Sequence, residues 1–557
     1  MKKIKNHKKV AVEIFFSIFL GTTAFLFVYG VEAFNIFPLA FNHADYIMYQ
    51  SSYYAFLESD WQYPVFNSNN FFVDKEINLY LFDYIPLYSI LLKFINTVFN
   101  YQFENPFTVW VLINTLLTFF FSFKILTLNR KLNLYYGLVG AFCISTLPLA
   151  PHKIQYHGGE GSHWILIAGI YFYLQSKEKV EYLYIFSLFA ALSLWIHFYL
   201  FTIVCGIWSA AVLENIIKNR NKKILLSIIL FLIIFTLIFF LSFGSYQNFF
   251  DTLNNVRSSN FNPDWSSEFN SFFCGNSQNS FLYEILMCFE PYTNKNIESY
   301  VYLGLGVILF SFIILKDFNN TVAMIRNHKV LLFVSLVFLF FSFGNRIKIA
   351  HKQIFEYQFN SLHHFLIDIY RAYARFSFLI YYLFVIYFIY KFLDLSKNKR
   401  VYTILFIIFV SIQFQDLNHE YNANEFIKMK TNSPNIEIID MSKSAINSKD
   451  ERLFVYPPNN CIEDFDLHLF SKEFIKNGGS VHTFIMDSLR GGKGMQNCKD
   501  FMNIELNLIT FSPHHFITNI DKESIPKEFI NMYDCETSKS FYYDDDMKRI
   551  YYCLKSN

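Results

Sequence analysis

A carboxylate stands in a short polar segment just after the first long apolar run of the chain. Asp45 follows His43 and begins a predicted helix over residues 46–58, with Gln50 inside that helix. The helix dipole keeps a carboxylate at this position ionised, and an ionised carboxylate at the edge of a bilayer can do acid–base chemistry on a lipid headgroup. The alternative is that Asp45 only caps the helix. Trp61 lies further along the same loop, where an aromatic ring suits a membrane interface and can stack on a sugar ring.

A second polar cluster is the segment His157-Gly158-Gly159-Glu160-Gly161-Ser162-His163. Its three glycines permit a tight turn or a close approach of the backbone to a ligand. His157, Glu160 and His163 are residue types that bind metals or transfer protons. The alternative is a glycine-rich hairpin whose polar side chains are solvated.

The third cluster is basic and lies in the loop 346–373 and at the start of the apolar run that follows. Arg371 and Arg375 are four residues apart, so on a helix they share a face, and two guanidinium groups can grip a phosphate or pyrophosphate. The alternatives are a locally different topology, or pairing with Asp368 and with lipid phosphates. The loop also contains Arg346, Lys348, Lys352, His363 and His364.

The elements that position these clusters are membrane helices. The 557 residues are 53% hydrophobic and only 17% charged, whereas soluble domains carry about a quarter charged residues. No long block of Lys and Arg indicates nucleic acid as a partner. Runs of roughly twenty apolar residues predict about eleven spans. They lie near 10–33, 105–127, 134–151, 163–176, 180–196, 198–217, 223–244, 299–316, 329–345, 374–391 and 401–415.

The basic clusters between these runs fix the predicted orientation. The first run follows the basic head MKKIKNHKK and has no clear cleavage site, which is typical of an uncleaved anchor with a cytoplasmic N-terminus. Loops 34–104, 152–162, 245–298 and 346–373, and the tail from about residue 416, are then extracytoplasmic. The basic clusters at 129–131, 177–179, 218–223, 326–329 and 397–400 are then cytoplasmic. The apolar stretch 79–99 breaks the alternation if it crosses, so we predict an interfacial or re-entrant helix; a twelfth span is the alternative.

The tail, residues 416–557, is polar and predicts a small α/β domain after a transmembrane domain of residues 1–415. A strand near 452–456, a helix over 465–476, a glycine pair and a second strand from Ser480 form a βαβ-like pattern. Six of the eight cysteines fall on the predicted outer side, which favours disulfides; free structural thiols are the alternative. These six are Cys274, Cys288, Cys461, Cys498, Cys535 and Cys553.

Several short motifs carry a resemblance to a known superfamily. They are Asp45 with Gln50, Trp61-Gln62-Tyr63-Pro64, Asp83-Tyr84-Ile85-Pro86, His163-Trp164, Arg371-Ala372-Tyr373-Ala374-Arg375-Phe376, and Tyr456-Pro457-Pro458 with Cys461. On these residues the chain resembles the GT-C superfamily of integral-membrane glycosyltransferases, and most closely a bacterial branch of it.

The resemblance implies a GT-C-like bundle in the bacterial cytoplasmic membrane. It implies a sugar donor linked to polyprenyl phosphate and a glycan or lipid-linked acceptor presented outside the cytoplasm. It also implies that Asp45 is the general base or a metal ligand. Many members carry a second carboxylate beside it, where this chain has His43.

We therefore expect an inverting transfer in which Asp45 accepts the acceptor's proton and Arg371 and Arg375 stabilise the departing phosphate. His43, Gln50, Trp61, Glu160 and His163 are the further substrate-binding candidates. Asp45, Glu160 and His157 would hold a divalent cation, Mg or Mn, if one is used.

Two other functions fit the same sequence. A non-catalytic translocase or binding protein for lipid-linked glycans would keep the arginine pair without needing Asp45. A scaffold in envelope-polysaccharide assembly would use the C-terminal domain to bind partners.

Overall fold

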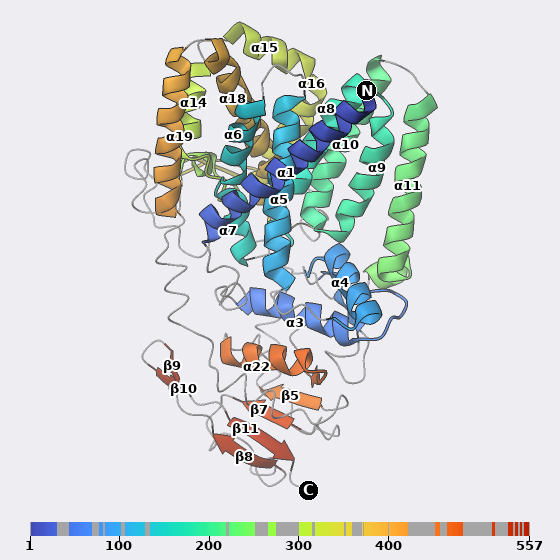
Figure 1. Ribbon diagram of the computed structural model, residues 1–557. Coiled ribbons are helices and arrows are strands. Elements are labelled where there is room, and N and C mark those ends of the chain that lie inside the picture. Colours follow the sequence, from blue (N-terminus) through green and yellow to red (C-terminus); the bar gives the residue numbers. More distant parts are fainter. Residues whose placement is uncertain are drawn as a thin grey trace. The chain divides into compact units, whose positions relative to one another are not determined.

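The computed structural model of the chain describes residues 2–30, 44–68, 77–81, 84–101, 106–128, 134–156, 158–218, 222–250, 266–274, 300–314, 318–349, 352–358, 370, 372–398, 400–420, 452–456, 465–482, 515–518, 533–537, 541–543, 546–548 and 551–555. The chain divides into two compact units (Figure 1). The first comprises residues 1–38, 105–238 and 262–427, and the second comprises residues 39–104, 239–261 and 428–557.

The first unit is a helical bundle, because long apolar runs satisfy their backbone groups internally only as helices. Helix α5 packs against α1, α6 and α8, α10 packs against α8, α9 and α16, and α14, α18 and α19 pack together. The helices of the first half are α1 (Lys2–Tyr29), α5 (Pro106–Thr127), α6 (Leu134–Ser145), α7 (Leu149–Tyr156), α8 (Trp164–Glu178), α9 (Tyr182–Leu192), α10 (Phe198–Lys218) and α11 (Lys222–Phe243). Those of the second half are α14 (Leu305–Ile314), α15 (Phe318–Asn327), α16 (Lys329–Ser342), the 3₁₀ turn η7 (Tyr373–Ser377), α18 (Phe378–Asn398) and α19 (Arg400–Glu420).

Among the described residues, six helical segments are long and apolar enough to cross a membrane. The molecule is therefore a mostly helical protein of the multi-pass membrane type. The described residues of the predicted apolar runs form helices over most of their length, although the run 299–316 is helical only in Leu305–Ile314. The six segments are Val12–Tyr29, Pro106–Thr127, Leu134–Ile154, Phe198–Lys218, Lys222–Phe243 and Tyr373–Leu395.

Two helix ends differ from their predicted positions. The run 134–151 is divided between α6 and α7 at Pro148, whose ring and missing N–H interrupt a helix. Helix α19 continues past the predicted end at residue 415, and Asp416 is buried rather than part of the polar tail. Its carboxylate accepts hydrogen bonds from the Tyr302 hydroxyl at 2.7 Å and from the Leu305 N–H at 2.9 Å, so it caps the start of α14.

The second unit contains α3 (Ala44–Glu58), α4 (Pro86–Phe99), α22 (Phe465–Lys476) and most of the β-structure. Helix α3 packs against α4 and α22. A five-stranded sheet has the order β6-β5-β7-β11-β8, with β5 parallel to β6 and β7, and β11 antiparallel to β7 and β8. Its strands are β5 (Arg452–Tyr456), β6 (Ser480–His482), β7 (His515–Thr518), β8 (Tyr533–Thr537) and β11 (Tyr551–Lys555).

The predicted strand–helix–strand pattern is confirmed in this unit, because α22 connects the parallel strands β5 and β6. The glycine pair ends the helix as expected. Gly478 adopts φ +94°, a left-handed conformation that favours glycine, and the Gly479 N–H donates to the Phe474 carbonyl at 3.1 Å.

The stretch 79–99 contains the 3₁₀ turn η1 (Leu79–Leu81) and α4. With 14 residues, α4 spans about 21 Å, less than the roughly 30 Å of a hydrocarbon core. Its length fits the predicted interfacial or re-entrant helix better than a twelfth span.

The described cysteines are of two kinds. Cys274, in a predicted outer loop, is disulfide-bonded. Cys143 and Cys205, which lie in candidate membrane helices, are free thiols. Cys535 and Cys553 face each other directly in the register of β8 and β11.

Candidate functional site

The glycine-rich segment forms a tight buried turn between α7 and α8. The Ser162 N–H donates to the Gly159 carbonyl at 3.1 Å, and the His163 N–H donates to the Gly161 carbonyl at 2.8 Å. A Cβ at Gly161 would lie 2.0 Å from Ile154 Cγ1 and 2.9 Å from the Ile154 backbone nitrogen, so only glycine fits against α7. The alternative of a solvated hairpin is wrong, because Glu160, Ser162 and His163 are all fully buried.

This close approach brings Glu160 to two cations (the Glu160 cluster, which is Lys153, Glu160 and Arg375). Glu160 Oε1 lies 3.2 Å from Lys153 Nζ, and Glu160 Oε2 lies 2.9 Å from Arg375 Nη2. The side chains of Lys153 and Glu160 are fully buried and that of Arg375 is 8% exposed. Charged groups are stable at such burial only when they are paired. Glu160 and Arg375 are 215 residues apart in the sequence and form a buried ion pair in the bundle.

Aromatic rings surround the cluster and orient its cations. The Arg375 guanidinium lies 4.5 Å from the centroid of the Tyr199 ring, and Lys153 Nζ lies 5.7 Å from that of Phe378. The Tyr199 hydroxyl also accepts a hydrogen bond from the Ala372 N–H at 3.0 Å, which ties the start of η7 to α10. Arg375 is thus held by a carboxylate on one side and by a ring face on another.

His163 precedes α8, close to the cluster in sequence. Its Nδ1 lies 2.9 Å from the Tyr382 hydroxyl, and its ring lies 4.7 Å from that of Phe378. Among the described residues, the buried Nε2 atom has no hydrogen-bond partner. Full burial favours the neutral imidazole, whose Nε2 can donate or accept a hydrogen bond depending on the tautomer.

The structure brings together three of the predicted site residues, Glu160, His163 and Arg375. Lys153, Tyr199 and Tyr382 were not predicted. Lys153 offers one sequence signal, since it is a single cation at the end of an apolar run, seven positions before Glu160. The tyrosines offer none among the 38 of the chain.

The other predicted residues are described in part or not at all. Asp45 is the second residue of α3, and its side chain lies outside what the structure describes. Gln50 is buried in α3, at 3% exposure. His43, His157 and Arg371 lie outside the described residues.

Trp61 is 46% exposed, as a ring at a membrane interface would be. Its Nε1–H donates to Thr97 Oγ1 at 3.1 Å, and Lys93 Nζ lies 5.0 Å from its ring. Lys93 is almost fully buried and donates to the carbonyls of Phe56 and Asp60 at 2.8 and 3.2 Å. It thereby neutralises the carbonyl end of α3, while burial lowers its pKa to about 8.

The predicted metal site is tested at one of its three residues. Glu160 is the member whose side chain is described, and both of its oxygens face cations at 3.2 and 2.9 Å. Cations at those positions repel a divalent ion, so the Glu160 carboxylate is poorly placed as a ligand for Mg or Mn. The described residues also contain no group of three or more His, Cys, Asp or Glu side chains that could hold a metal.

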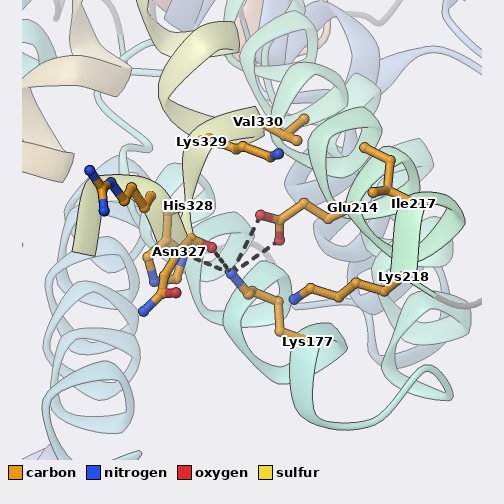
Figure 2. A pocket seen from close by; sticks show the side chains of 9 residues that line it. Lys177, Glu214, Ile217, Lys218, Asn327, His328, Lys329 and Val330 are labelled. Carbon is orange, nitrogen blue, oxygen red and sulfur yellow. Dashed lines mark hydrogen bonds and ion pairs between the residues drawn. The ribbon is translucent and has the colours of Figure 1, made fainter. Parts of the chain in front are cut away.

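Cations of three predicted cytoplasmic loops gather at the other end of α8. Lys177, Lys218, Arg326 and Lys329 line a single pocket of about 320 Å³, together with Glu214 (Figure 2). The Glu160 cluster and this pocket are thus assembled from residues that the sequence assigned to opposite sides of the membrane.

Comparison with known proteins gives one family match. The family described as Domain of unknown function (DUF6311) matches residues 18–418. The matched range includes α3, α4 and the helices of the first unit up to α19. No curated protein matches the chain.

Proposed function

The chain belongs to the DUF6311 family, and we propose that it is a membrane glycosyltransferase of the GT-C type. It would transfer a sugar from a polyprenyl-phosphate donor to a glycan or lipid-linked acceptor on the extracytoplasmic side of the bacterial cytoplasmic membrane. About eleven spans, a cytoplasmic N-terminus and an extracytoplasmic α/β domain complete the proposal.

The proposed alternation of spans between residues 160 and 375 is supported by two groupings. Glu160 and Arg375 belong to two different segments predicted outside, and they are in contact. Lys177, Lys218 and Arg326 belong to three loops predicted inside, and they line one pocket. An error of one span between Glu160 and Arg375 would separate the members of at least one group.

The observation that carries the proposed chemistry is the Glu160 cluster. Loss of a lipid phosphate from a sugar develops negative charge, and preorganised cations stabilise it most in a dry site. Arg375 is preorganised, because Glu160 and Tyr199 hold its guanidinium from two directions. Lys153 is fully buried, so it would act through its electrostatic field rather than through contact with the donor.

The proposed step is a direct displacement with inversion. The acceptor oxygen attacks the anomeric carbon, its proton passes to the Asp45 carboxylate, and the bond from the anomeric carbon to the phosphate oxygen breaks. The electron pair leaves with the polyprenyl phosphate, whose charge Arg375 and Arg371 stabilise. His163 and Trp61 are proposed to orient the sugars. No step is routed through a metal ion, in view of the cations that flank Glu160.

A complemented deletion strain tests the proposal. Mass spectrometry of lipid-linked and surface glycans would compare wild type with Asp45→Asn, Arg375→Gln and Arg346→Gln. Arg346 is a matched control because it belongs to the same predicted outer loop but is exposed and paired with Glu356 at 2.9 Å. We expect Asp45→Asn to lower transfer by about 10²-fold or more, and Arg346→Gln to leave it unchanged.

The outcomes also separate the other functions. Undiminished transfer by Asp45→Asn at normal expression would refute the base assignment. If Arg375→Gln then abolished delivery of the glycan, the translocase would be favoured. If neither variant changed any glycan while complex assembly failed, the scaffold would be favoured.

A further inference from the structure

The pocket at the C-terminal end of α8 is a second charged site, separate from the Glu160 cluster. Helices α8, α10, α15 and α16 supply its lining. Figure 2 shows Lys177, Lys218 and Glu214 from the first two helices opposite Asn327, His328 and Lys329. The pocket holds about 320 Å³. The full lining is Lys177, Glu214, Ile217, Lys218, Arg326, Asn327, His328, Lys329 and Val330.

One cation of this pocket is internally satisfied. Lys177 Nζ lies 3.2 Å from Glu214 Oε2 and donates to the Asn327 carbonyl. It also lies 3.2 Å from His328 Nδ1, which in turn is 3.1 Å from the Tyr173 hydroxyl. Glu214 therefore neutralises Lys177, and this network forms a fixed wall of the pocket.

The remaining three cations give the pocket its charge. Lys218, Arg326 and Lys329 are exposed, and none of them makes an ion pair with any residue that the structure describes. Lys329 and Val330 are the first residues of α16, a 14-residue helix whose start has no side-chain cap. A helix start adds partial positive charge and free N–H groups to such a site. The pocket is built for an anion.

The surroundings indicate what carries that anion. Helix α10 is a candidate membrane span, and Lys218 is its last residue. Ile217 lines the pocket and is 66% exposed, and Leu213, one turn deeper, is 48% exposed. On α16, Phe333 and Val337 are 67% and 51% exposed. A charged pocket that continues into exposed apolar helix faces matches a headgroup with its acyl chains, whereas a free phosphate would leave these faces unused.

We propose that this pocket binds the phosphate headgroup of an anionic phospholipid in the leaflet at the C-terminal end of α8, predicted to be cytoplasmic. Lys218, Arg326 and Lys329 would contact the phosphate, while the acyl chains would lie along Ile217 and Phe333. The binding is independent of the proposed sugar transfer, because no lining residue belongs to the Glu160 cluster.

Native mass spectrometry of the full-length, delipidated protein tests this site. The probes are phosphatidylglycerol, zwitterionic phosphatidylcholine and inorganic phosphate. The test variant is Arg326→Ala/Lys329→Ala. The matched control, Lys222→Ala/Arg400→Ala, removes the same two charge types from exposed helix starts that are predicted to face the same side but do not line the pocket.

We expect one phosphatidylglycerol to bind in preference to phosphatidylcholine, with about 10- to 30-fold weaker binding in the test variant and unchanged binding in the control. Lys218→Ala alone should weaken binding several-fold, which keeps the test valid if the double variant unfolds. Equal losses in test and control variants would show general surface attraction and overturn the site. Binding of phosphate that displaces no phosphatidylglycerol, or no preference between the two lipids, would overturn the headgroup assignment.

Discussion

The two ends of α8 carry similar groups in opposite settings. At its N-terminal end, Glu160 is enclosed with Lys153 and Arg375 at 0–8% exposure. At its C-terminal end, about 22 Å along the helix axis, Glu214 pairs with Lys177 at the wall of an open pocket. One glutamate is sealed among its cations, and the other leaves neighbouring cations exposed.

The difference shows how burial determines the role that an ion pair can have. In the sealed cluster every charge depends on its neighbours, so the geometry is fixed and suits a preorganised electrostatic role. In the open pocket Lys177 is already satisfied, and exposed cations are available for a mobile ligand. Substitutions at matched positions of the two ends should therefore have unequal effects.

The largest difference in the free energy of unfolding is expected between Glu160→Gln and Glu214→Gln. Glu160→Gln removes one buried carboxylate from two cations at once and should lower the free energy of unfolding by about 3–5 kcal/mol. Glu214→Gln should cost about 1–2 kcal/mol, because Lys177 keeps the Asn327 carbonyl and borders the pocket. Thermal unfolding in detergent compares the two. Equal losses would mean that burial does not distinguish the two ends.

The next largest loss of stability is expected at Gly161, where the backbone before α8 lies closest to α7. Gly161→Ala places a methyl group against the Ile154 backbone and should destabilise the protein by about 2–3 kcal/mol. Gly169→Ala is the control within α8, since its Cβ would meet side-chain atoms and no backbone, the nearest being the end of Ile207 at 3.2 Å. Alanine favours a helix over glycine, so this control should be neutral or stabilising. A neutral Gly161→Ala would contradict the close approach.

Much of this architecture could be predicted from the sequence, for a physical reason. A run of apolar residues has few alternatives to a helix in a membrane, so the predicted runs fall on helices. The alternation of basic loops predicted that Glu160 and Arg375 lie on the same side, and their contact came from the structure. The pattern from Arg452 to His482 was readable because glycine pairs end helices in a specific way.

The rest depends on tertiary contacts. A glycine-rich polar segment looks the same whether it is solvated or buried, and only the packing of Gly161 on α7 decides. Lys153 was missed because a lone lysine beside an apolar run normally reaches water. Lys93 was missed for the same reason, since its partners are backbone carbonyls that no side-chain pattern reveals.

Two adjacent tyrosines offer a finer test of the sealed end. Tyr382 hydrogen-bonds to His163, whereas the buried Tyr381 hydroxyl has no hydrogen-bond partner among the described residues. Tyr382→Phe should cost about 1–2 kcal/mol of unfolding free energy, because it leaves a buried His163 nitrogen unsatisfied. Tyr381→Phe should be neutral or slightly stabilising. The reverse order, measured by thermal unfolding, would mean that the His163 contact contributes nothing.

The smallest expected effect lies at the open end and depends on pH. Burial, and next the positive charge of Lys177, lower the pKa of His328 to about 4, while Glu214 opposes this shift and Lys218 adds to it. The unfolded chain has a histidine pKa of about 6.5, so between pH 6.5 and 4 the unfolded state binds more protons than the folded one. Stability is therefore complete above pH 6.5 and falls as the pH decreases toward 4.

His328→Gln separates this contribution from all other titrations. The amide keeps a polar group beside Lys177 and Tyr173 but cannot titrate. Between pH 7 and pH 5.5 the wild type should lose about 1 kcal/mol more unfolding free energy than the variant. If the two proteins lost the same amount, protonation of His328 would be tolerated, and the network around Lys177 would be less rigid than the wall of the pocket requires. If the wild type loses more, a second positive charge beside Lys177 is not tolerated, because Glu214 is the one carboxylate described there and it already neutralises Lys177.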